Sequence, residues 1–331
     1  MASQVVPDQW SAAETQVVAD AVIRAPSVHN IQPWTVRLTG RDAQLRERED
    51  VTLPHFDPHG RDRTLSCGAA LANLELAVRV LGRDVTTSLY PDPAQPDLVA
   101  TVTAGARRAP GTADLHRYGA ISRRRSYRRQ FTGVLVSEHE LAAVAQAGTT
   151  PGVGVLPVRG ERDPAAVAAL LLTAAQTSRR DHGYQRELAL WTIRDHRSHR
   201  HGVGIIAADL TAGALPWAGL VRSATDVPRR DVLLRRLGQE GLLLFHTPGD
   251  SPADHLRAGY ALQSAWLTAI DAGLVASVLT QPLHDPGIRS AMARSLGLAG
   301  YPQVLIRIGH SLGTPAPASL RRAIGEVLLR P

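Results

Sequence analysis

The chain has 331 residues, a formal net charge of +7 and 44% apolar residues, which suits one large globular domain or two of ordinary size. All 37 basic side chains are arginines, because the sequence contains no lysine, and this excludes a P-loop lysine, a pyridoxal phosphate Schiff base and a lysine nucleophile. A single cysteine, Cys67, excludes an internal disulfide and any four-cysteine metal site.

The positive charge alone would allow nucleic-acid binding. However, the arginines are spread along the chain, only 4% of residues are aromatic, and no homeodomain, RRM-like or zinc-finger pattern occurs. No apolar run reaches the roughly 20 residues of a transmembrane helix, and residues 1–14 lack the basic and apolar segments of a secretory signal. We therefore expect a cytoplasmic protein without a nucleic-acid or membrane partner.

The first part of the chain predicts a mixture of helices and strands. Ser11 and Glu14 form a capping-box pattern before a helix that runs to about Arg24, where Pro26 ends it. The further elements expected here are hairpin strands over 34–38 and 44–48, a buried helix over about 66–82 with Cys67 as a small core residue, strands over 86–90 and 99–102, and a linker over 104–113.

The second part opens with a predicted helix over 114–121, and Ser137 with Glu140 forms another capping box. Residues 194–230 are rich in Gly, Arg and His without periodicity, and we interpret them as an extended surface segment or lid. The other expected elements are strands over 153–158, 242–245, 275–279 and 304–308, and helices over 164–191, 251–272 and 285–296. The fold class is α+β, with helices packed on sheets.

Several motifs have a simpler explanation than catalysis. GHSLG (309–313) matches a nucleophile elbow, but no histidine follows it, so the triad order cannot be completed and a strand-to-loop turn is favoured. GVGIIA (202–207) follows RSHRH rather than a strand, which favours a flexible loop over a dinucleotide fingerprint. The nearby arginines would repel a metal from His196, His199 and His201, so we expect no metal site there.

Two segments point to a ligand instead. RRRSYRR (123–129) is compatible with a solvated basic face, but arginine forks and a hydroxyl also suit a phosphate monoester. APSVHNIQPW (25–34) places Ser, His, Asn and Gln between two prolines. A plain connection between helix and strand would account for it, but such an amide-rich loop can also serve the pyrimidine edge of a flavin.

These segments resemble the nitroreductase family. APSVHNIQPW is similar to its A-P-S-x-x-N-x-Q-P-W motif and RRSYR (124–128) to its R-R-S-x-R motif, while LVASVLTQP (274–282) and YPQVLIRIGH (301–310) are similar to the closing section of that fold. Ordinary nitroreductases carry the arginine motif first, whereas here it comes second and SCGAAL (66–71) lies between the two. That layout resembles the Acg-type branch, in which one chain mimics the usual dimer.

The resemblance implies a nitroreductase-like fold of two fused halves, 1–110 and 111–331, with helices packed on mixed or antiparallel sheets. It implies one FMN per chain. The residues implied around the flavin ring or ribityl chain are Ser27, His29, Asn30 and Gln32, with Thr280 and Gln281 near flavin N5. The residues implied around the phosphate are Arg124, Arg125, Ser126, Arg128, Arg321 and Arg322.

The implied chemistry is hydride transfer from NAD(P)H to the flavin and then reduction of a small-molecule acceptor that the sequence does not identify. The cofactor carries the reaction, and no side chain is assigned as an acid or base. The main alternative is an FMN-sequestering protein whose flavin is covered by the lid segment and turns over little. A flavin oxidase or dehydrogenase acting on a biosynthetic substrate stays open as a third interpretation.

Overall fold

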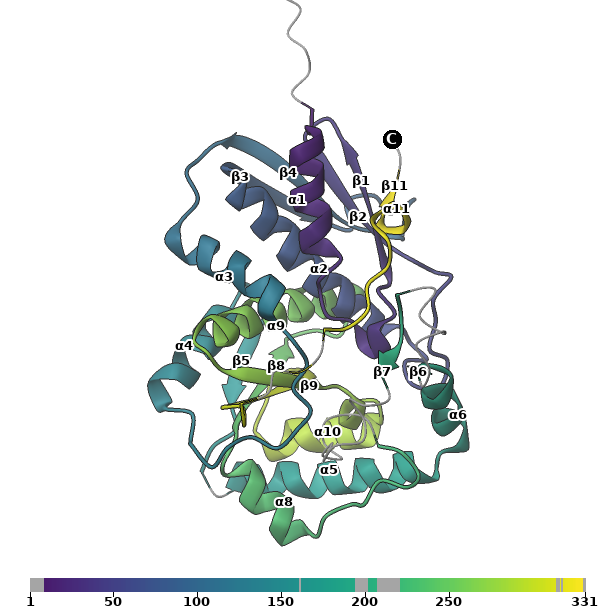
Figure 1. Cartoon of the computed structure of the whole chain (residues 1–331). Helices are drawn as coiled ribbons and strands as arrows, with labels where there is room; N and C mark the ends of the chain where they lie inside the picture. Colours follow the sequence, from purple (N-terminus) through teal and green to yellow (C-terminus); the bar gives the residue numbers. More distant parts are fainter. Residues whose placement is uncertain are drawn as a thin grey trace, which may run out of the picture.

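Two long helices, α2 (Arg61–Val80) and α9 (Pro252–Asp271), lie against each other in the middle of the molecule (Figure 1). The computed structural model describes residues 9–160, 162–193, 202–206, 221–313, 316 and 318–329. A Cβ atom on Gly68 would overlap the carbonyl oxygen of Leu256, and one on Gly259 would overlap that of Leu65. The two backbones can approach this closely only because both contact positions are glycine.

The first sheet is built mainly by the early part of the chain and has the strand order β11-β1-β2-β4-β3. Its strands are β1 (Trp34–Thr39), β2 (Asp42–Glu47), β3 (Arg83–Leu89), β4 (Leu98–Arg107) and β11 (Leu328–Leu329). The pairs are antiparallel except that β11 runs parallel to β1, with Val36 opposite Leu328. Helices α1 (Ala12–Val22), α3 (Thr112–Arg123) and α11 (Ile324–Val327) lie nearby.

The second sheet is antiparallel, with the order β5-β8-β10-β9. Its strands are β5 (Gly154–Pro157), β8 (Gly241–Thr247), β9 (Val275–Leu279) and β10 (Tyr301–Gly309). The helices on this side are α4 (Glu138–Gly148), α5 (Arg162–Arg180), α8 (Arg230–Leu237) and α10 (Pro286–Ser295). Helix α6 (His182–Leu190) follows α5 and contacts it. A parallel pair, β6 (Thr192–Ile193) and β7 (Ile205–Ile206), forms a small third sheet.

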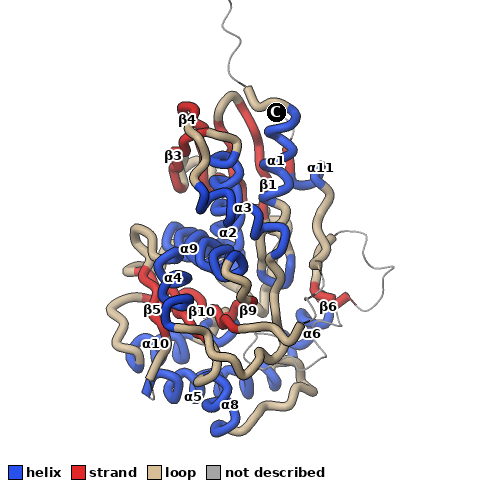
Figure 2. The backbone as a smooth tube through the Cα atoms, turned by 60° about the vertical axis from the view of Figure 1, so that its left-hand side comes forward, coloured by secondary structure: helices blue, strands red, loops and turns tan. Residues whose placement is uncertain are grey.

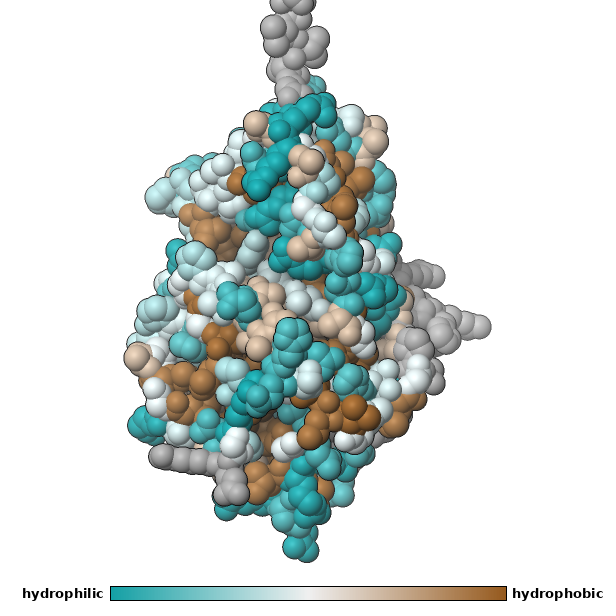
Figure 3. All heavy atoms as spheres, turned by 90° about the vertical axis from the view of Figure 1, so that its left-hand side faces the viewer, coloured by the Kyte–Doolittle hydropathy of each residue, from teal (hydrophilic) through white to brown (hydrophobic). Residues whose placement is uncertain are grey.

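One apolar core runs through both sheets. Figure 2 shows the strands of the first sheet on one side of α2 and α9 and those of the second sheet on the other, with α5 and α8 beyond the second sheet. Trp34 and Leu45 of the first sheet belong to the same buried cluster as Phe245 and Ile306 of the second. Leu115 and Val134 are exposed apolar side chains. On the face shown in Figure 3, apolar surface is divided into several separate patches. Within the described chain, no helix has the length and apolar character to cross a bilayer.

Local sequence signals predicted most of the helices and strands. Both predicted capping boxes, Ser11 with Glu14 and Ser137 with Glu140, are confirmed, and Cys67 is fully buried. The linker expected over 104–113 is wrong, because β4 continues to Arg107 by pairing with β3 and α3 starts at Thr112. The single helix expected over 164–191 is also wrong, because Asp181 interrupts it and caps α6 through the amide of Tyr184 at 2.9 Å. Helix α8 was not predicted.

Candidate functional site

The loop over residues 25–34 has an unusual backbone. His29, Asn30 and Gln32 adopt positive φ angles of 44°, 56° and 49°, a region that side chains other than glycine rarely occupy. Ser27 Oγ accepts the amide of Gln32 at 3.0 Å, and the amide of Val28 donates to Ser66 Oγ at 3.1 Å. These bonds hold strained residues against the start of α2, which is the kind of strain that concentrates at binding sites.

A cavity of about 730 Å³, part of it open to solvent, lies beside this loop. Its mixed polar and apolar lining is that of a small-molecule site. The wall is formed by segments that are far apart in the sequence. Its residues are Pro26–His29, Phe56, then Asp62, Leu65, Ser66 and Ala69 of α2, Ser126 and Arg128, Ile205, Leu262 and Trp266 of α9, Ser277, Val278 and Thr280 around the end of β9, and Val304 of β10. Ser126 forms a parallel bridge to Ala276, so the arginine-rich segment follows β9 into the site.

Arg124 is the most unusual charge in this region. It is only 3% exposed, and its Nε and one terminal nitrogen have no hydrogen-bond partner within the part of the chain that the structure describes. Its guanidinium lies 4.5 Å over the ring of Trp266. Burial lowers the pKa of Arg124 well below its usual range, and Arg321, Arg125 and Arg128 lower it further. A buried cation surrounded by like charges is costly unless an anion joins it.

Arg321 brings a distant segment into the same cluster. One terminal nitrogen donates to Asn30 Oδ1 at 2.7 Å, and the other donates to the carbonyl of Arg24 at 3.3 Å, an oxygen that also accepts from Arg124. Burial, with Arg125 and Arg24, lowers the pKa of Arg321 to about 10. The arginines near residue 124 and near residue 321 therefore meet at one place, which is an arrangement suited to phosphate.

Of the twelve residues expected from the sequence, five line the cavity: Ser27, His29, Ser126, Arg128 and Thr280. The side-chain amides of Asn30 and Gln32 bind backbone instead. Asn30 Nδ2 donates to the carbonyls of Gly204 and Leu320, and Gln32 joins the carbonyl of Gly202 to the amide of Arg322. These two amides tie together segments that border the cavity.

The other expected residues lie outside the cavity wall. Arg125 donates to the carbonyls of Ser122 and Arg124, and Arg322 faces the carbonyl of Ile31 and the carboxylate of Glu326. Gln281 bonds to Ser178 of α5. Arg124 and Arg321 contact the same backbone oxygen at the edge of the site.

His29 presents a neutral imidazole to the cavity. Both ring nitrogens lack partners among the described residues although the side chain is buried. Burial lowers its pKa to about 3, with a further contribution from His284 and an opposing one from Asp62. A neutral imidazole offers one donor and one acceptor, so His29 can bind either kind of polar atom on a ligand.

Sequence reasoning missed a second group that lines or supports the site. Asp62 in the first turn of α2 lines the cavity and accepts from His284 Nε2 at 2.9 Å and from Arg61. Burial raises the pKa of the Asp62 carboxyl, but His284 and Arg61 outweigh it and hold that pKa below its usual range. Phe56 also lines the cavity. The one sequence signal was the polar stretch before SCGAAL, which has no periodicity to assign its members.

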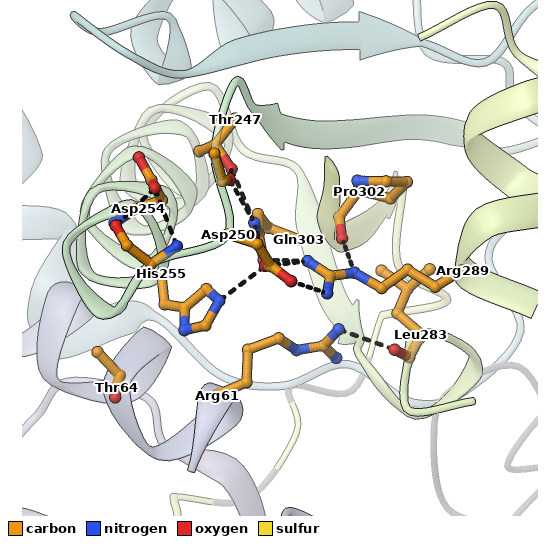
Figure 4. A network of polar contacts seen from close by, with 12 residues as sticks. Arg61, Thr64, Thr247, Asp250, Asp254, His255, Leu283, Arg289, Pro302 and Gln303 are labelled. Atoms are coloured by element: carbon orange, nitrogen blue, oxygen red, sulfur yellow. Dashed lines mark hydrogen bonds and ion pairs between the residues drawn. The ribbon is translucent and has the colours of Figure 1, made fainter. Parts of the chain in front are cut away.

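A larger cavity of about 1580 Å³, again partly open, lies near the starts of α2 and α9. Asp250 on its wall accepts from both terminal nitrogens of Arg289 at 2.6 Å and from His255 at 2.9 Å (Figure 4). Gln303 joins the same carboxylate at 3.1 Å. These partners already satisfy the carboxylate, so the network holds the wall in place.

Part of the segment over 194–230 can also be located. Residues 194–201 and 207–220 lie outside the described residues, including His196, His199 and His201. The carbonyl of Gly202 accepts from the side-chain amide of Gln32, and that of Gly204 accepts from the side-chain amide of Asn30. Ile205 lines the first cavity. A short piece of this segment therefore forms part of the wall.

No family model matches the chain. The Mycobacterium tuberculosis protein named "Putative NAD(P)H nitroreductase Rv3131" is 32% identical over 325 residues, which cover 96% of this chain and 91% of that protein. The protein of the same species named "Putative NAD(P)H nitroreductase acg" is 28% identical and covers 95% of each chain. The solved FMN and NADPH-dependent nitroreductase NfnB of Sphigopyxis sp. strain HMH is 18% identical over 64% of this chain and 96% of its own, with a TM-score of 0.42.

Proposed function

Because the chain belongs to the nitroreductase superfamily, in its Acg-like branch, we propose that it is an FMN-dependent oxidoreductase that takes electrons from NAD(P)H and reduces a small-molecule acceptor. The names of these two relatives include the electron donor, NAD(P)H. Neither name gives the acceptor, so the class of the acceptor has to be inferred from the shape of the cavity.

The observation that carries the cofactor assignment is the buried guanidinium of Arg124, two of whose nitrogens have no hydrogen-bond partner among the described residues. Its two unpartnered nitrogens are buried beside Arg321 and Arg128, and their charges repel one another. The phosphate of FMN would supply both the missing acceptors and the missing negative charge. Riboflavin would supply neither.

The remaining residues fit the rest of the cofactor. Ser27, His29, Ser126 and Thr280 offer polar atoms along the wall, and Leu262 and Trp266 offer apolar surface. When bound, FMN supplies two-electron chemistry, accepting hydride from NAD(P)H and passing it to an acceptor. The protein's part is to bind the phosphate, orient the ring with the strained loop and exclude water with the α9 side chains.

We further propose that the chain is a pseudo-dimer of halves 1–110 and 111–331. Two features support this. The helices α2 and α9 have equal length, 20 residues each, and meet at a matched pair of glycines. The cavity takes the strained loop from one half and the arginine-rich segment from the other. In addition, the segment over 318–329 crosses back to the first sheet.

A second candidate function is FMN sequestration with little turnover. It is favoured by Ile205, which is 4% exposed and lines the cavity, and by the bonds from Asn30 and Gln32 that hold residues 202–204 beside it. A segment fixed in this way would limit the approach of NAD(P)H to the flavin.

The test of the cofactor is its stoichiometry. Purified protein, reconstituted with FMN and denatured after removal of free ligand, is expected to release one FMN per chain. A chain that takes up no FMN, or that releases two equivalents, would contradict the assignment.

Stopped-flow reduction distinguishes the two functions. An oxidoreductase is expected to bleach the flavin band rapidly with NADH or NADPH. A sequestering protein is expected to react slowly with both nucleotides but readily with dithionite, which is small enough to reach a covered ring.

A further inference from the structure

The two cavities are separated at Phe56. This side chain is 3% exposed and belongs to the wall of the 730 Å³ cavity and also to the wall of the 1580 Å³ cavity. It lies in the irregular segment before α2. The side chain of Phe56 therefore decides how far the smaller cavity extends.

Three other rings fix the position of the Phe56 ring. His29 lies 4.2 Å from it at an interplanar angle of 54°, and His284 lies 4.4 Å from it at 79°, edge to face. Tyr184 of α6 stacks at 5.6 Å. Contacts of this kind from both cavities and from α6 leave the ring little freedom to rotate.

The backbone of Phe56 is fixed as well. The carboxylate of Glu187, which is buried in α6, accepts the amide of His55 at 3.0 Å and that of Phe56 at 2.7 Å. Hydrogen bonds to an ionised acceptor are the stronger kind. The helix also fits closely on the loop, since a Cβ atom on Gly183 would overlap the ring of His55. Phe56 is therefore a rigid wall rather than a mobile side chain.

On the basis of the proposed function, we propose that Phe56 is a specificity-determining residue that restricts the acceptor beside the flavin to compact planar molecules of about one ring. A longer molecule would have to pass through the position of the Phe56 ring to reach the second cavity. Beyond that ring the wall carries Arg61 and Arg294 as well as Asp57 and Asp250, and Asp250 is already paired with Arg289 and His255. The arginines there can receive an extension with an anionic end in the space that truncation opens.

The test uses two redox-inert probes, benzoate and biphenyl-4-carboxylate, which differ by one ring. FMN-loaded protein is titrated with each, and binding is followed by the change in the flavin absorption spectrum and by calorimetry. Wild-type protein is expected to bind benzoate at least about tenfold more tightly than the biphenyl probe, a discrimination typical of a closed pocket. Phe56→Ala is expected to abolish that preference while changing benzoate affinity less than about threefold.

Phe131→Ala is the matched control. Phe131 is 4% exposed, almost as buried as Phe56, but it lines neither cavity and packs on Arg307 and Tyr127. It is expected to keep the wild-type preference. If Phe56→Ala does not fold, Phe56→Leu and Glu187→Gln reduce or loosen the same wall and are expected to weaken the preference in part.

An unchanged preference in the folded Phe56 variants, an equal change in Phe131→Ala, or equal binding of both probes by wild-type protein would overturn the proposal. Failure of the proposed function is a separate result, because the wild-type chain would then take up no FMN before any probe is added. Calorimetry with the two probes on the flavin-free protein would still decide whether Phe56 limits ligand length.

Discussion

The two faces of α9 differ in whether the polar groups beside them are hydrogen-bonded. On the face that carries Tyr260 and Ser264, Glu75 accepts from Tyr260 at 2.9 Å, from Arg79 at 2.6 Å and from Thr87 at 2.6 Å. On the face that carries Leu262 and Trp266, the Trp266 indole nitrogen and two nitrogens of Arg124 have no partner among the residues that the structure describes. The first, whose polar groups bond to one another, is called the closed face below. The second, whose three nitrogen donors have no partner among the described residues, is called the open face.

The same difference appears in the space available. The closed face has a pocket of about 250 Å³ between α2 and α9, against about 730 Å³ on the open face. On the closed face, side chains of the protein take the place that a ligand could occupy between α2 and α9. This difference supports the expectation of one FMN per chain.

The largest expected effect comes from breaking the helix contact that both faces share. Gly259→Val would place side-chain atoms against the backbone of Leu65, so we expect a loss of more than about 3 kcal/mol in the free energy of unfolding, or no folded protein. Thermal unfolding followed by circular dichroism measures it.

Gly119→Ala in α3 is the control for that change, since a Cβ atom there meets nothing within 4 Å. It is expected to raise stability by about 0.5–1 kcal/mol. Similar thermal midpoints for the two variants would mean that the glycine contact does not hold the faces together.

The next effect belongs to the open face. Arg124→Ala is expected to weaken FMN binding by about 1.5–3 kcal/mol, or tenfold to a hundredfold, and riboflavin binding much less, because only FMN carries the phosphate. Arg123→Ala is the matched control, since Arg123 is exposed and pairs with Asp271. Equal losses for FMN and riboflavin would remove Arg124 from the phosphate site.

The pH dependence of stability tests a second group on the open face, His29. The folded-state pKa of His29 is about 3, below the ordinary value of 6.5, so the unfolded chain takes up the proton first as the pH falls. The contribution of His29 to the free energy of unfolding is therefore fully present above pH 6.5 and falls as the pH is lowered towards 3. About 2 kcal/mol of this contribution is lost by pH 5.

Urea unfolding at pH 7 and pH 5 measures this loss. In His29→Gln the group cannot titrate, so the variant should lose about 2 kcal/mol less than the wild type over this interval. If both proteins lose the same amount, His29 is not the group responsible.

The smallest effect is expected on the closed face. Glu75→Gln removes the charge that three donors share, and because Arg79 is one-third exposed we expect a loss of only about 1 kcal/mol. FMN stoichiometry should stay at one per chain. Glu138→Gln, whose side chain is 92% exposed, should change neither quantity. A second equivalent of FMN in Glu75→Gln would show that this cluster alone keeps the face closed.

Elements whose signals are local could be predicted from the sequence. The bounds of β9 at Val275–Leu279 and the capping box at Ser11 follow from residues within a few positions of each other. Two features without such a local signal were not predicted. The extension of β4 to Arg107 depends on pairing with Arg83, 24 positions earlier. The break between α5 and α6 depends on Asp181, a residue type that can lie inside a helix or cap its start.

The candidate site divides in the same way. The motifs identified Ser27, His29, Ser126, Arg128 and Thr280, which do line one cavity. They did not indicate that the side-chain amides of Asn30 and Gln32 would donate hydrogen bonds to backbone carbonyls near residues 202 and 320. Such partners are distant in sequence and are brought together only by the fold. Phe56 and Glu187 carry no motif, and their roles depend on contact between loop and helix.

The parallel pairing of β11 with β1 has a consequence for biosynthesis. Residues 328 and 329 leave the ribosome long after Val36 and Arg37, their partners in the first sheet, have been translated. Arg321, which joins Arg124 at the same carbonyl, is equally late. Contacts across nearly 300 positions form last and slowly. A nascent chain can therefore form the second sheet and strands β1 to β4 of the first while β11 and Arg321 are still missing. Tight capture of a phosphorylated ligand is then delayed until translation has passed this segment.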